Sequence, residues 1–400
     1  MGLLECSNTY RAFAGTCTQC GHCTGACTSL TTAQMTLGDI AKHMLAAERA
    51  SETVEDLAVN LISDEQLVQA VRGCFFCTSC KNTCFAHNDV CDLIYHARVD
   101  FQKAGLIPKE AWSSVQVDQQ WDVFTAYRAV YGITFADLTR HIATEQAPAA
   151  TDCQVAFFPG CALAAYGPEL TREIFSTIED LGGKTTLLDH CCGSPLKSAG
   201  FFDRAEALCN RISDEVVTSG ASQIVCVCPG CANAMKKTLA RNGVEGVEVT
   251  TLPAFLNDHG FTAKKRLPDR PLFISKSCQD RDGSYLEQTC QVLGIDPETP
   301  SVFNGCCGAG GAVSAFSPNR QACQSDSKLS FAPDGSTVVT MCPTCTYTYA
   351  FRLAENGRDL ENKHYAELLF QNQLDWDQVI ANLTGMWGGE YAAWLMSVLY

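Results

Sequence analysis

Ten cysteines in the second part of this 400-residue chain form two sets with the same pattern. Each set has a single cysteine, then an adjacent Cys-Cys pair followed by glycine, then a C-x-x-C. Between the single cysteine and the pair lie 29 residues in the first set and 27 in the second. Between the pair and the C-x-x-C lie 35 residues in the first set and 34 in the second. Such matched spacing indicates an internal duplication. The sets are Cys161, Cys191, Cys192, Cys228 and Cys231, and Cys278, Cys306, Cys307, Cys342 and Cys345.

The residue types in these sets favour an iron–sulfur cluster over a single metal ion. Side chains of adjacent cysteines point apart in an extended chain, so the pair crowds one tetrahedral ion but easily serves two metal atoms. Five soft sulfur donors also exceed the four of a zinc site and suit iron–sulfur chemistry. Zinc with a spare thiol is the alternative for one repeat. The glycines after the pairs would let backbone N–H groups approach a cluster, and they are Gly193, Gly308, Gly310 and Gly311.

Two further cysteine runs lie near the start of the chain. Both have the spacing C-x2-C-x2-C-x3-C, which is typical of paired cubane 4Fe–4S clusters in which the fourth cysteine of each run binds the other cluster. We therefore expect one cubane on Cys17, Cys20, Cys23 and Cys84, and the other on Cys74, Cys77, Cys80 and Cys27. Thr28 and Phe85 stand where a proline usually follows the fourth cysteine, which leaves the ligand count intact.

Composition restricts the partners and the compartment. A net charge of −15 argues against nucleic acid as a partner. The chain has no run of about 18 apolar residues and no charged segment followed by an apolar one at its start. Because 25 cysteines in a reducing compartment are metal ligands before they are disulfides, we expect a cytoplasmic protein, held at the inner membrane, if at all, only through a partner.

The elements that must position these cysteines change in type along the chain. Between the cubane runs, helices are predicted from capping boxes at Thr36 with Asp39 and Ser63 with Gln66, and from an apolar stripe at Leu37, Ile40, Met44 and Leu45. From residue 154, short apolar runs alternate with amphipathic stretches, which predicts α/β structure with parallel sheets. The predicted strands are Val155–Phe158, Thr185–Leu188, Ile224–Val227, Leu272–Ser275 and Val338–Met341, and the predicted helices include Glu169–Leu181, Asp203–Thr218 and Ala232–Arg241. Cys161, Cys228 and Cys342 directly follow strands, where open α/β sheets place their sites.

We expect five segments along the chain. They are a domain for the two cubanes over residues 1–110, a helical linker over 111–150, the first cysteine-rich domain over 151–268, the second over 269–375, and a helical tail over 376–400. The apolar stripes of the tail, broken at Gly388-Gly389, either pack on the chain's own core or dock a partner subunit. The cysteines outside these sets are interpreted as small core residues, namely Cys6, Cys91, Cys153, Cys209, Cys226, Cys290 and Cys323.

With two cubane runs followed by two complete repeats, the chain resembles the catalytic iron–sulfur subunit of heterodisulfide reductase in its fused form. The resemblance rests on 18 cysteines and covers nearly the whole chain. It implies an α-helical ferredoxin domain followed by two duplicated, Rossmann-like α/β domains of the CCG type, packed as a pseudo-twofold pair. It also implies two cubane and two non-cubane 4Fe–4S clusters, each non-cubane cluster bound by the five cysteines of one repeat. One departure is Lys276-Ser277-Cys278-Gln279, where relatives usually have Asp-Pro before the cysteine and His after it. Substrate contacts there are therefore expected to differ.

The resemblance further implies a reaction, the reduction of a disulfide substrate. A partner passes electrons singly to the cubanes, and the two non-cubane clusters together supply the two electrons that cleave a disulfide substrate between them. The partner would be a flavoprotein or a membrane cytochrome b in a hetero-oligomeric complex, since the sequence has no flavin, nicotinamide or haem motif. The alternative is the electron-transfer subunit of a glycolate, lactate or glycerol-3-phosphate oxidase-type complex, in which a flavoprotein handles the substrate. Both repeats being complete favours disulfide chemistry.

Overall fold

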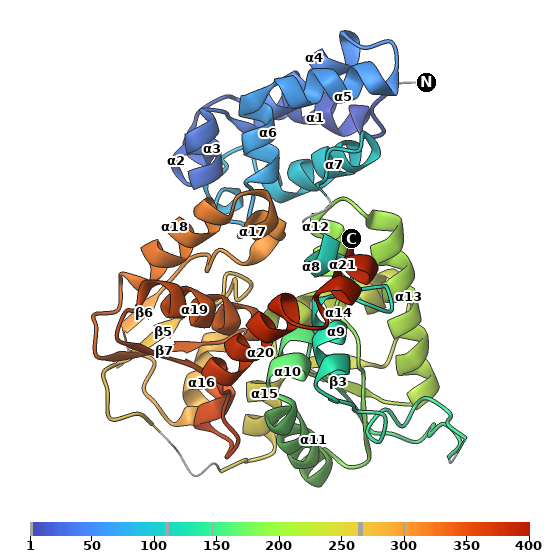
Figure 1. Ribbon diagram of the computed structural model, residues 1–400, viewed down its shortest axis with the longest axis vertical. Coiled ribbons are helices and arrows are strands. Elements are labelled where there is room, and N and C mark those ends of the chain that lie inside the picture. Colours follow the sequence, from blue (N-terminus) through green and yellow to red (C-terminus); the bar gives the residue numbers. More distant parts are fainter. Residues whose placement is uncertain (1–2, 109–111, 146, 263–266, 299–300) are drawn as a thin grey trace. The chain divides into compact units, whose positions relative to one another are not determined.

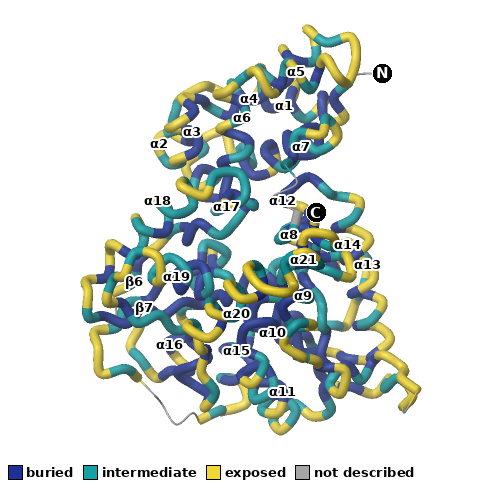
Figure 2. The backbone as a smooth tube through the Cα atoms, viewed as in Figure 1, coloured by how far each residue is buried: buried dark blue, intermediate teal, exposed yellow. Residues whose placement is uncertain are grey.

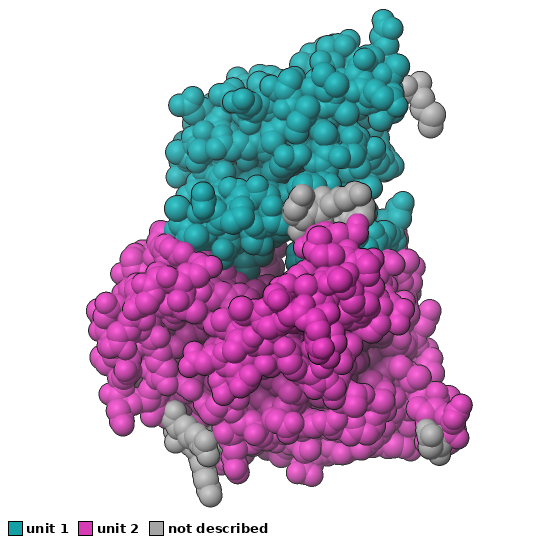
Figure 3. Space-filling view, in the orientation of Figure 1, with its two compact units in different colours: residues 1–116, 194–205, 308–324 teal, residues 117–193, 206–307, 325–400 magenta. Residues whose placement is uncertain are grey.

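The computed structural model describes residues 3–108, 112–145, 147–262, 267–298 and 301–400. The chain forms two compact units, which Figure 3 distinguishes by colour. Unit 1 comprises residues 1–116, 194–205 and 308–324, and unit 2 comprises 117–193, 206–307 and 325–400. The units do not follow chain order, because the stretches directly after the two Cys-Cys pairs belong to unit 1. The expected domain boundary at 110–111 lies outside the described residues.

The first part of unit 1 is helical because its polar caps and apolar stripes agree. Thr36 and Asp39 form the predicted capping box of α4, and the stripe from Leu37 to Leu45 is buried. The predicted box at Ser63 is wrong: Ser63 ends α5, and Asp64 caps α6 by accepting a hydrogen bond from the backbone N–H of Leu67. The helices are α1 (Ser7–Thr16), α2 (His22–Gly25), α3 (Thr28–Ala33), α4 (Leu37–Arg49), α5 (Val54–Ser63) and α6 (Glu65–Arg72).

The rest of unit 1 is built from short elements around one long helix. That helix is α7 (Val90–Lys103), whose N-terminus is capped by the carboxylate of Asp89. The shorter elements, labelled in part in Figure 1, are η1 (Lys81–Thr83), α8 (Trp112–Val115), α12 (Ser194–Ser198), η3 (Gly310–Ala312) and α17 (Val313–Phe316). Unit 1 also includes the beginning of α18 (Pro318–Leu329).

Unit 2 contains two four-stranded parallel sheets with the same strand order. The first runs β2-β1-β3-β4 and the second β6-β5-β7-β8. The five predicted strands are confirmed as β1 (Val155–Phe158), β2 (Thr185–Leu187), β3 (Gln223–Cys226), β5 (Leu272–Ser275) and β7 (Ser336–Thr340). Three strands were not predicted: β4 (Glu248–Thr251), β6 (Ser301–Phe303) and β8 (Leu360–His364). All three are edge strands, and their mixed polarity hides them from a search for apolar runs.

Helices connect the parallel strands, as this topology requires. The predicted helices are confirmed as α11 (Pro168–Gly182), α13 (Phe202–Ser219) and α14 (Pro229–Arg241). The others in this part are α9 (Val123–Val130), α10 (Cys161–Tyr166), α15 (Leu252–Asp258), α16 (Ser284–Leu293), α19 (Pro343–Asn356) and η4 (Tyr365–Leu368). One apolar core joins both sheets, since Phe157 and Val225 of the first share it with Ile274 and Val339 of the second. Strand β7, labelled in Figure 2, is buried along its whole length.

The C-terminal tail packs on the chain itself. It forms α20 (Trp376–Gly388) and α21 (Ala392–Leu399), with the break at the predicted glycines. Val379, Met386, Leu395 and Leu399 are buried in a second apolar cluster with residues of α9 and α10. Packing on the chain's own core, one of the two interpretations of the tail, is therefore what the structure has. No helix in the described part of the chain is long and apolar enough to cross a membrane.

Candidate metal centres

The fold brings the cysteines of each repeat to one edge of its sheet. In the first repeat, Cys161 follows β1, the Cys-Cys pair follows β2, and Cys228 follows β3. In the second repeat, β5, β6 and β7 precede the equivalent cysteines. Since parallel strands end at the same edge, this topology places all five cysteines of a repeat at the carboxyl ends of three neighbouring strands, β2, β1 and β3 or β6, β5 and β7.

The two C-x-x-C motifs adopt the same local structure. Cys228 and Cys342 are extended residues at the N-cap of α14 and α19, and a proline follows each as the first helical residue. Proline suits that position because its missing N–H would have no partner there. The second cysteine of each motif therefore lies in the first helical turn, where the helix dipole acts against the hydrogen bonds and burial that raise the pKa of Cys231 and of Cys345.

The thiols of the first repeat form a hydrogen-bonded network. Hydrogen bonds with Cys161 and Cys192 raise the pKa of the Cys191 thiol well above its ordinary value. Hydrogen bonds with Cys192 and Cys228 do the same to the pKa of Cys231. The network thus joins all five predicted ligands of this repeat, Cys161, Cys191, Cys192, Cys228 and Cys231.

The second repeat brings fewer of its cysteines into such contact. The Sγ atom of Cys345 lies 3.0 Å from that of Cys307, and a further hydrogen bond joins it to Cys342. Cys306 is buried next to Cys307. Cys278 is half-buried and accepts a hydrogen bond from Gln279 Nε2 at 3.8 Å, and within the described residues it makes none to the other four.

A contact between the repeats connects the two networks. The Sγ atoms of Cys228 and Cys342 lie 3.3 Å apart. The hydrogen bond from Cys228, followed by one from Cys345, lowers the pKa of Cys342 well below its ordinary value. A chain of sulfur contacts therefore runs from the first repeat to the second inside unit 2.

The donors in unit 2 fit a sulfur-ligated metal cluster. In the described part of the chain, no group of three cysteine, histidine or carboxylate side chains is arranged as a ligand set for one ion. His364 is fully buried, and burial lowers its pKa to about 3, so its ring is neutral. Its Nδ1 accepts from the N–H of Ala366, which leaves the proton on Nε2, and Nε2 has no partner among the described residues. An orphaned N–H donor near Cys342 is the kind of group that bonds to cluster sulfur.

The two cubane runs of unit 1 share a local backbone feature. Gln19 and Phe76 both have positive φ angles, 54° and 53°, which are uncommon for residues with side chains. As a result the N–H of Gln19 donates to Cys17 Sγ and the N–H of Phe76 donates to Cys74 Sγ, both at 3.4 Å. The repeated N–H to sulfur hydrogen bond favours thiolates at equivalent positions and fits a cluster with sulfur ligands.

The fourth cysteine of each run lies beside the other run. A hydrogen bond with Cys80 lowers the pKa of Cys27 to about 6. On the other side, the residues flanking Cys84 both contact His22, which lies between Cys20 and Cys23. Thr83 Oγ1 donates to the carbonyl of His22 at 3.5 Å, and the rings of His22 and Phe85 are 4.7 Å apart.

The predicted glycines fall into two groups. Gly193 and Gly308 directly follow the Cys-Cys pairs and have positive φ angles of 75° and 92°. Gly310 and Gly311 belong to unit 1, where they pack against the backbone that carries Cys74 and Phe75. A Cβ atom on Gly311 would lie 2.1 Å from the carbonyl oxygen of Cys74, so no side chain fits there.

Six of the remaining cysteines are buried, as expected. Cys323, on α18, is exposed, so its interpretation as a core residue is wrong. Most residues of α18 are polar, and a helix with a solvent-facing side explains the exposure.

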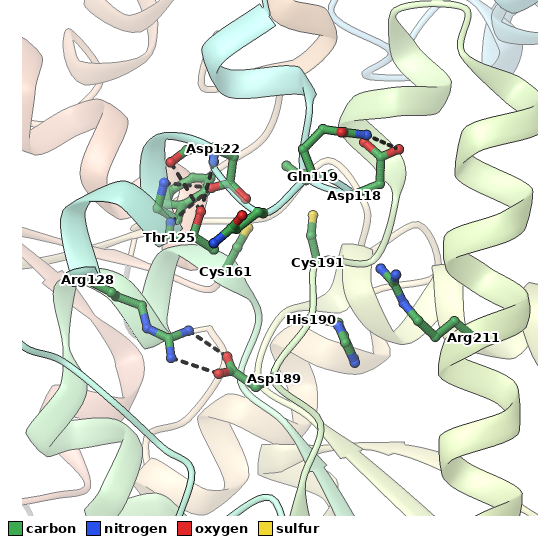
Figure 4. Close-up of a pocket in the computed structure, with 13 residues that line it drawn as sticks. Asp118, Gln119, Asp122, Thr125, Arg128, Cys161, Asp189, His190, Cys191 and Arg211 are labelled. Carbon is green, nitrogen blue, oxygen red and sulfur yellow. Dashed lines mark hydrogen bonds and ion pairs between the residues drawn. The ribbon is translucent and has the colours of Figure 1, made fainter. Parts of the chain in front are cut away.

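A cavity of about 350 Å³ adjoins the first repeat in unit 2. Cys161 and Cys191 line it, and Figure 4 shows Arg211 of α13 on one side and Arg128 of α9 on another. Arg128 forms a bidentate pair with Asp189 at 2.6 and 2.7 Å. The other lining residues include Asp118, Gln119, Asp122, Thr125 and His190.

One ion-pair network extends from this cavity into the core. Glu215 accepts hydrogen bonds from Nε2 of both His190 and His141, at 2.7 and 2.9 Å. Burial raises the pKa of Glu215, but these two hydrogen bonds outweigh it and hold the pKa at about 2. Sequence reasoning missed Arg128, Asp189, Arg211 and Glu215, because no local spacing links single charged residues so far apart in the chain.

Comparison with known proteins adds a family and several relatives. The family model of the cysteine-rich CCG domain matches twice, over residues 155–236 and 275–349. One subunit of the CoM/CoB fumarate reductase of Methanothermobacter marburgensis is 26% identical over 54% of this chain and 46% of its own length. One subunit of the dihydromethanophenazine:CoB–CoM heterodisulfide reductase of Methanosarcina acetivorans is 25% identical over 74% of this chain and 75% of its own. One subunit of the anaerobic glycerol-3-phosphate dehydrogenase of Escherichia coli is 26% identical over 60% of this chain and 63% of its own length.

The extent of these matches differs. The chain spans about half the length of the fumarate reductase subunit and three quarters of the heterodisulfide reductase subunit. No solved structure gives a significant match.

Proposed function

Because this chain carries the CCG cysteine-rich domain twice and is an iron–sulfur subunit related to heterodisulfide reductase, we propose that it reduces a disulfide substrate with electrons from a partner. The proposed balance is one disulfide, two electrons and two protons, giving two thiols. The S–S bond breaks, each sulfur gains one electron, and the partner subunit is the reductant.

The contact between Cys228 and Cys342 carries this proposal. A disulfide that is split into two thiolates needs two electron-donating groups close together, and a pair of complete cysteine sets meeting at 3.3 Å supports that geometry. The matched strand orders of the two sheets support a pseudo-twofold arrangement of the repeats.

The cysteines would hold four groups. Under the proposal, each repeat holds a non-cubane 4Fe–4S cluster through its five cysteines, and unit 1, as an α-helical ferredoxin domain, holds two cubanes through the crossed sets. When bound, these clusters supply one-electron carriers and, at the two repeats, the electrons for S–S cleavage. Zinc in one repeat is the alternative, for which the isolated position of Cys278 is the supporting observation.

Residues around the cavity in unit 2 would bind the substrate next to the first repeat. Arg211, a cation without an ion-pair partner among the described residues, would attract an anionic group on the disulfide. The bidentate pair of Arg128 and Asp189 fixes the opposite wall. Cys161 and Cys191 lie at the surface of the same cavity, so a bound substrate would reach their site.

The proposal includes a hetero-oligomeric complex with a flavoprotein or a membrane cytochrome b as electron donor. It is supported by the relatives' names, which designate subunits of reductases and of a dehydrogenase. The exposed Cys20 in the first cubane run supports entry of electrons at that cluster.

A second candidate is an electron-transfer subunit of a glycolate, lactate or glycerol-3-phosphate oxidase-type complex. The match to the Escherichia coli glycerol-3-phosphate dehydrogenase favours it, although that match covers less of this chain than the heterodisulfide reductase match. In that case a flavoprotein partner would handle the substrate, and this chain would only carry electrons.

Anaerobic purification with bound partners, followed by metal analysis and activity assays, tests the proposal. Four clusters at four irons each predict about sixteen irons per chain. The preparation should also oxidise a reduced viologen dye when disulfides are added. About eight irons with stoichiometric zinc would rule out two non-cubane clusters. Reduction of an oxidised dye with glycolate, lactate or glycerol 3-phosphate as electron donor, without oxidation of reduced dye by disulfides, would favour the second candidate.

A further inference from the structure

Arg98 of α7 is fully buried in unit 1, and within the described residues its hydrogen bonds go to backbone carbonyls. Its guanidinium has five N–H groups, and five hydrogen bonds of 2.5–3.0 Å use the whole fork. The acceptors are the carbonyl oxygens of Val71, Arg72, Cys74, Ser198 and Gly311. The rings of Phe76 and Phe316 lie 4.9 and 5.1 Å from the guanidinium carbon.

The charge of Arg98 has no carboxylate partner among the described residues. Burial, the main cause, lowers the pKa of Arg98 to about 10, so the group stays charged at neutral pH. Removing an unpaired cation from water is costly unless an anion or strong acceptors replace the water. The five carbonyls satisfy its hydrogen bonds but not its charge, and one of those carbonyls belongs to the predicted ligand Cys74.

A second arginine lies against the residue that precedes Cys74, and its hydrogen-bond donors are not all paired in the described part of the chain. Arg320 of α18 has two buried nitrogens, Nε and Nη2, without a hydrogen-bond partner in the described part of the chain. A Cβ atom on Gly73 would lie 2.6 Å from its Nη1, so the guanidinium rests against the residue that precedes Cys74. Burial lowers the pKa of Arg320, and Cys27 and Cys74 are the neighbours that oppose this effect.

These contacts converge on one predicted cluster. Cys27 and Cys74 come from different runs, and only the crossed assignment places both on the same cubane. A cubane with four thiolate ligands is an anion, and each electron that it accepts adds a negative charge. It would therefore supply both the missing counter-charge for Arg98 and the missing acceptors for Arg320.

We infer that Arg98 and Arg320 form a cationic site for the cubane of Cys74, Cys77, Cys80 and Cys27, in which Arg320 donates hydrogen bonds to cluster or cysteine sulfur. The two fixed charges raise the reduction potential of this cubane, because they stabilise the reduced, more negative state most strongly. This inference rests on the proposed function, since it requires the cubanes. Arg98 and Arg320 are positioning residues that act through the cluster and do not touch substrate.

The test is an anaerobic potentiometric titration of the whole chain, followed by electron paramagnetic resonance, with iron analysis of every sample. Arg320→Gln removes the charge, Arg320→Lys keeps the charge but changes the donor geometry, and Arg49→Gln removes an exposed charge of unit 1 as the matched control. Cys27→Ser identifies which of the two cubane signals belongs to the site.

In Arg320→Gln we expect the signal that Cys27→Ser alters to need a lower potential for reduction. The shift should be at least tenfold in the ratio of reduced to oxidised cluster, which is about 59 mV for one electron. Arg320→Lys should shift the same signal less, and Arg49→Gln should shift neither. If Arg320→Gln loses iron, Arg320→Lys must keep it and still show the shift.

Two results separate the possible failures. Full iron content with an unshifted signal in both Arg320 variants, or a shift confined to the other cubane, overturns the inference and leaves the proposed function intact. Absence of any cubane signal in the unaltered protein overturns both.

Discussion

The Sγ atoms of Cys228 and Cys342 lie 3.3 Å apart, although the residues are 114 positions apart in the chain. Each is the first cysteine of a C-x-x-C and stands at the N-cap position of a helix that begins with proline. Each also follows an interior strand of its sheet, β3 or β7. The duplication has therefore brought equivalent cysteines into contact. Sulfur contacts therefore run from the first donor set into the second, with Cys278 outside them, and this connection underlies the proposal of joint chemistry.

The crossed assignment of the cubanes predicts which cluster each fourth cysteine serves. Cys27→Ser should perturb the cluster of Cys74, Cys77 and Cys80, because the thiol of Cys27 is hydrogen-bonded to Cys80. Cys84→Ser should perturb the cluster of the first run. Electron paramagnetic resonance of the two variants, with the exposed Cys323→Ser as control, checks this. A change confined to the cluster of the mutated cysteine's own run would show the assignment to be wrong.

Gly311→Ala should destabilise unit 1 by about 2 kcal/mol or more. The residue has a φ of 70°, and a Cβ atom would meet the carbonyl oxygen of Cys74 at 2.1 Å. The displaced backbone would also lose the hydrogen bond from Arg98 to Gly311. Anaerobic thermal unfolding measures the effect. Gly385→Ala, in α20 with open space around it, is the matched control and should be neutral or stabilising by up to ~1 kcal/mol. Equal behaviour of the two variants would refute the packing argument.

Glu367 should make stability depend on pH in unit 2. Burial raises its pKa from an ordinary 4.5 to about 7, against the opposing effect of the N–H groups of Leu374 and His364. Since the folded state holds this proton more tightly than the unfolded state, the contribution is fully present below pH 4.5 and is lost as pH rises through about 7.

The variant Glu367→Gln removes this titration. The melting temperature of the variant minus that of the unaltered protein should therefore increase as the pH is raised from about 5 to about 8. Glu245→Gln, at an exposed position, is the control for the substitution itself. A constant difference for Glu367→Gln would mean that this carboxyl is ionised throughout.

Much of the fold was predictable because the central strands are short apolar runs. Val155–Phe158 and Leu272–Ser275 were predicted with the bounds that the structure has. Strand β8 was missed because its sequence, Leu360–His364, is mostly polar and lies at a sheet edge. The stretches after the Cys-Cys pairs gave no local sign that they belong to unit 1, since the residues that bind them are distant in sequence. Arg98, for example, reaches Gly311 across 213 positions.

The residues of the candidate sites were likewise predictable only where they follow a local sequence pattern. Regular spacing predicted the cysteines, because cluster ligands repeat in motifs, and their roles as ligands stay predictions. The polar residues around them were not predictable. Arg128 and Asp189 are 61 positions apart in the chain. Arg320 is a candidate site residue because the fold places its guanidinium against Gly73, next to Cys74. Such residues belong to no motif and become visible only once the chain is folded.

The most direct test of the central claim compares Cys192→Ser, Cys307→Ser and the double variant in anaerobic turnover of a disulfide with an artificial electron donor. If the two repeats cleave the disulfide together, each single loss should abolish reduction as completely as the double loss, because residues that act as a unit lose function non-additively. The cubanes should stay reducible in all three variants, which shows that electrons still enter. Substantial disulfide reduction in either single variant would contradict cleavage by the two repeats acting together.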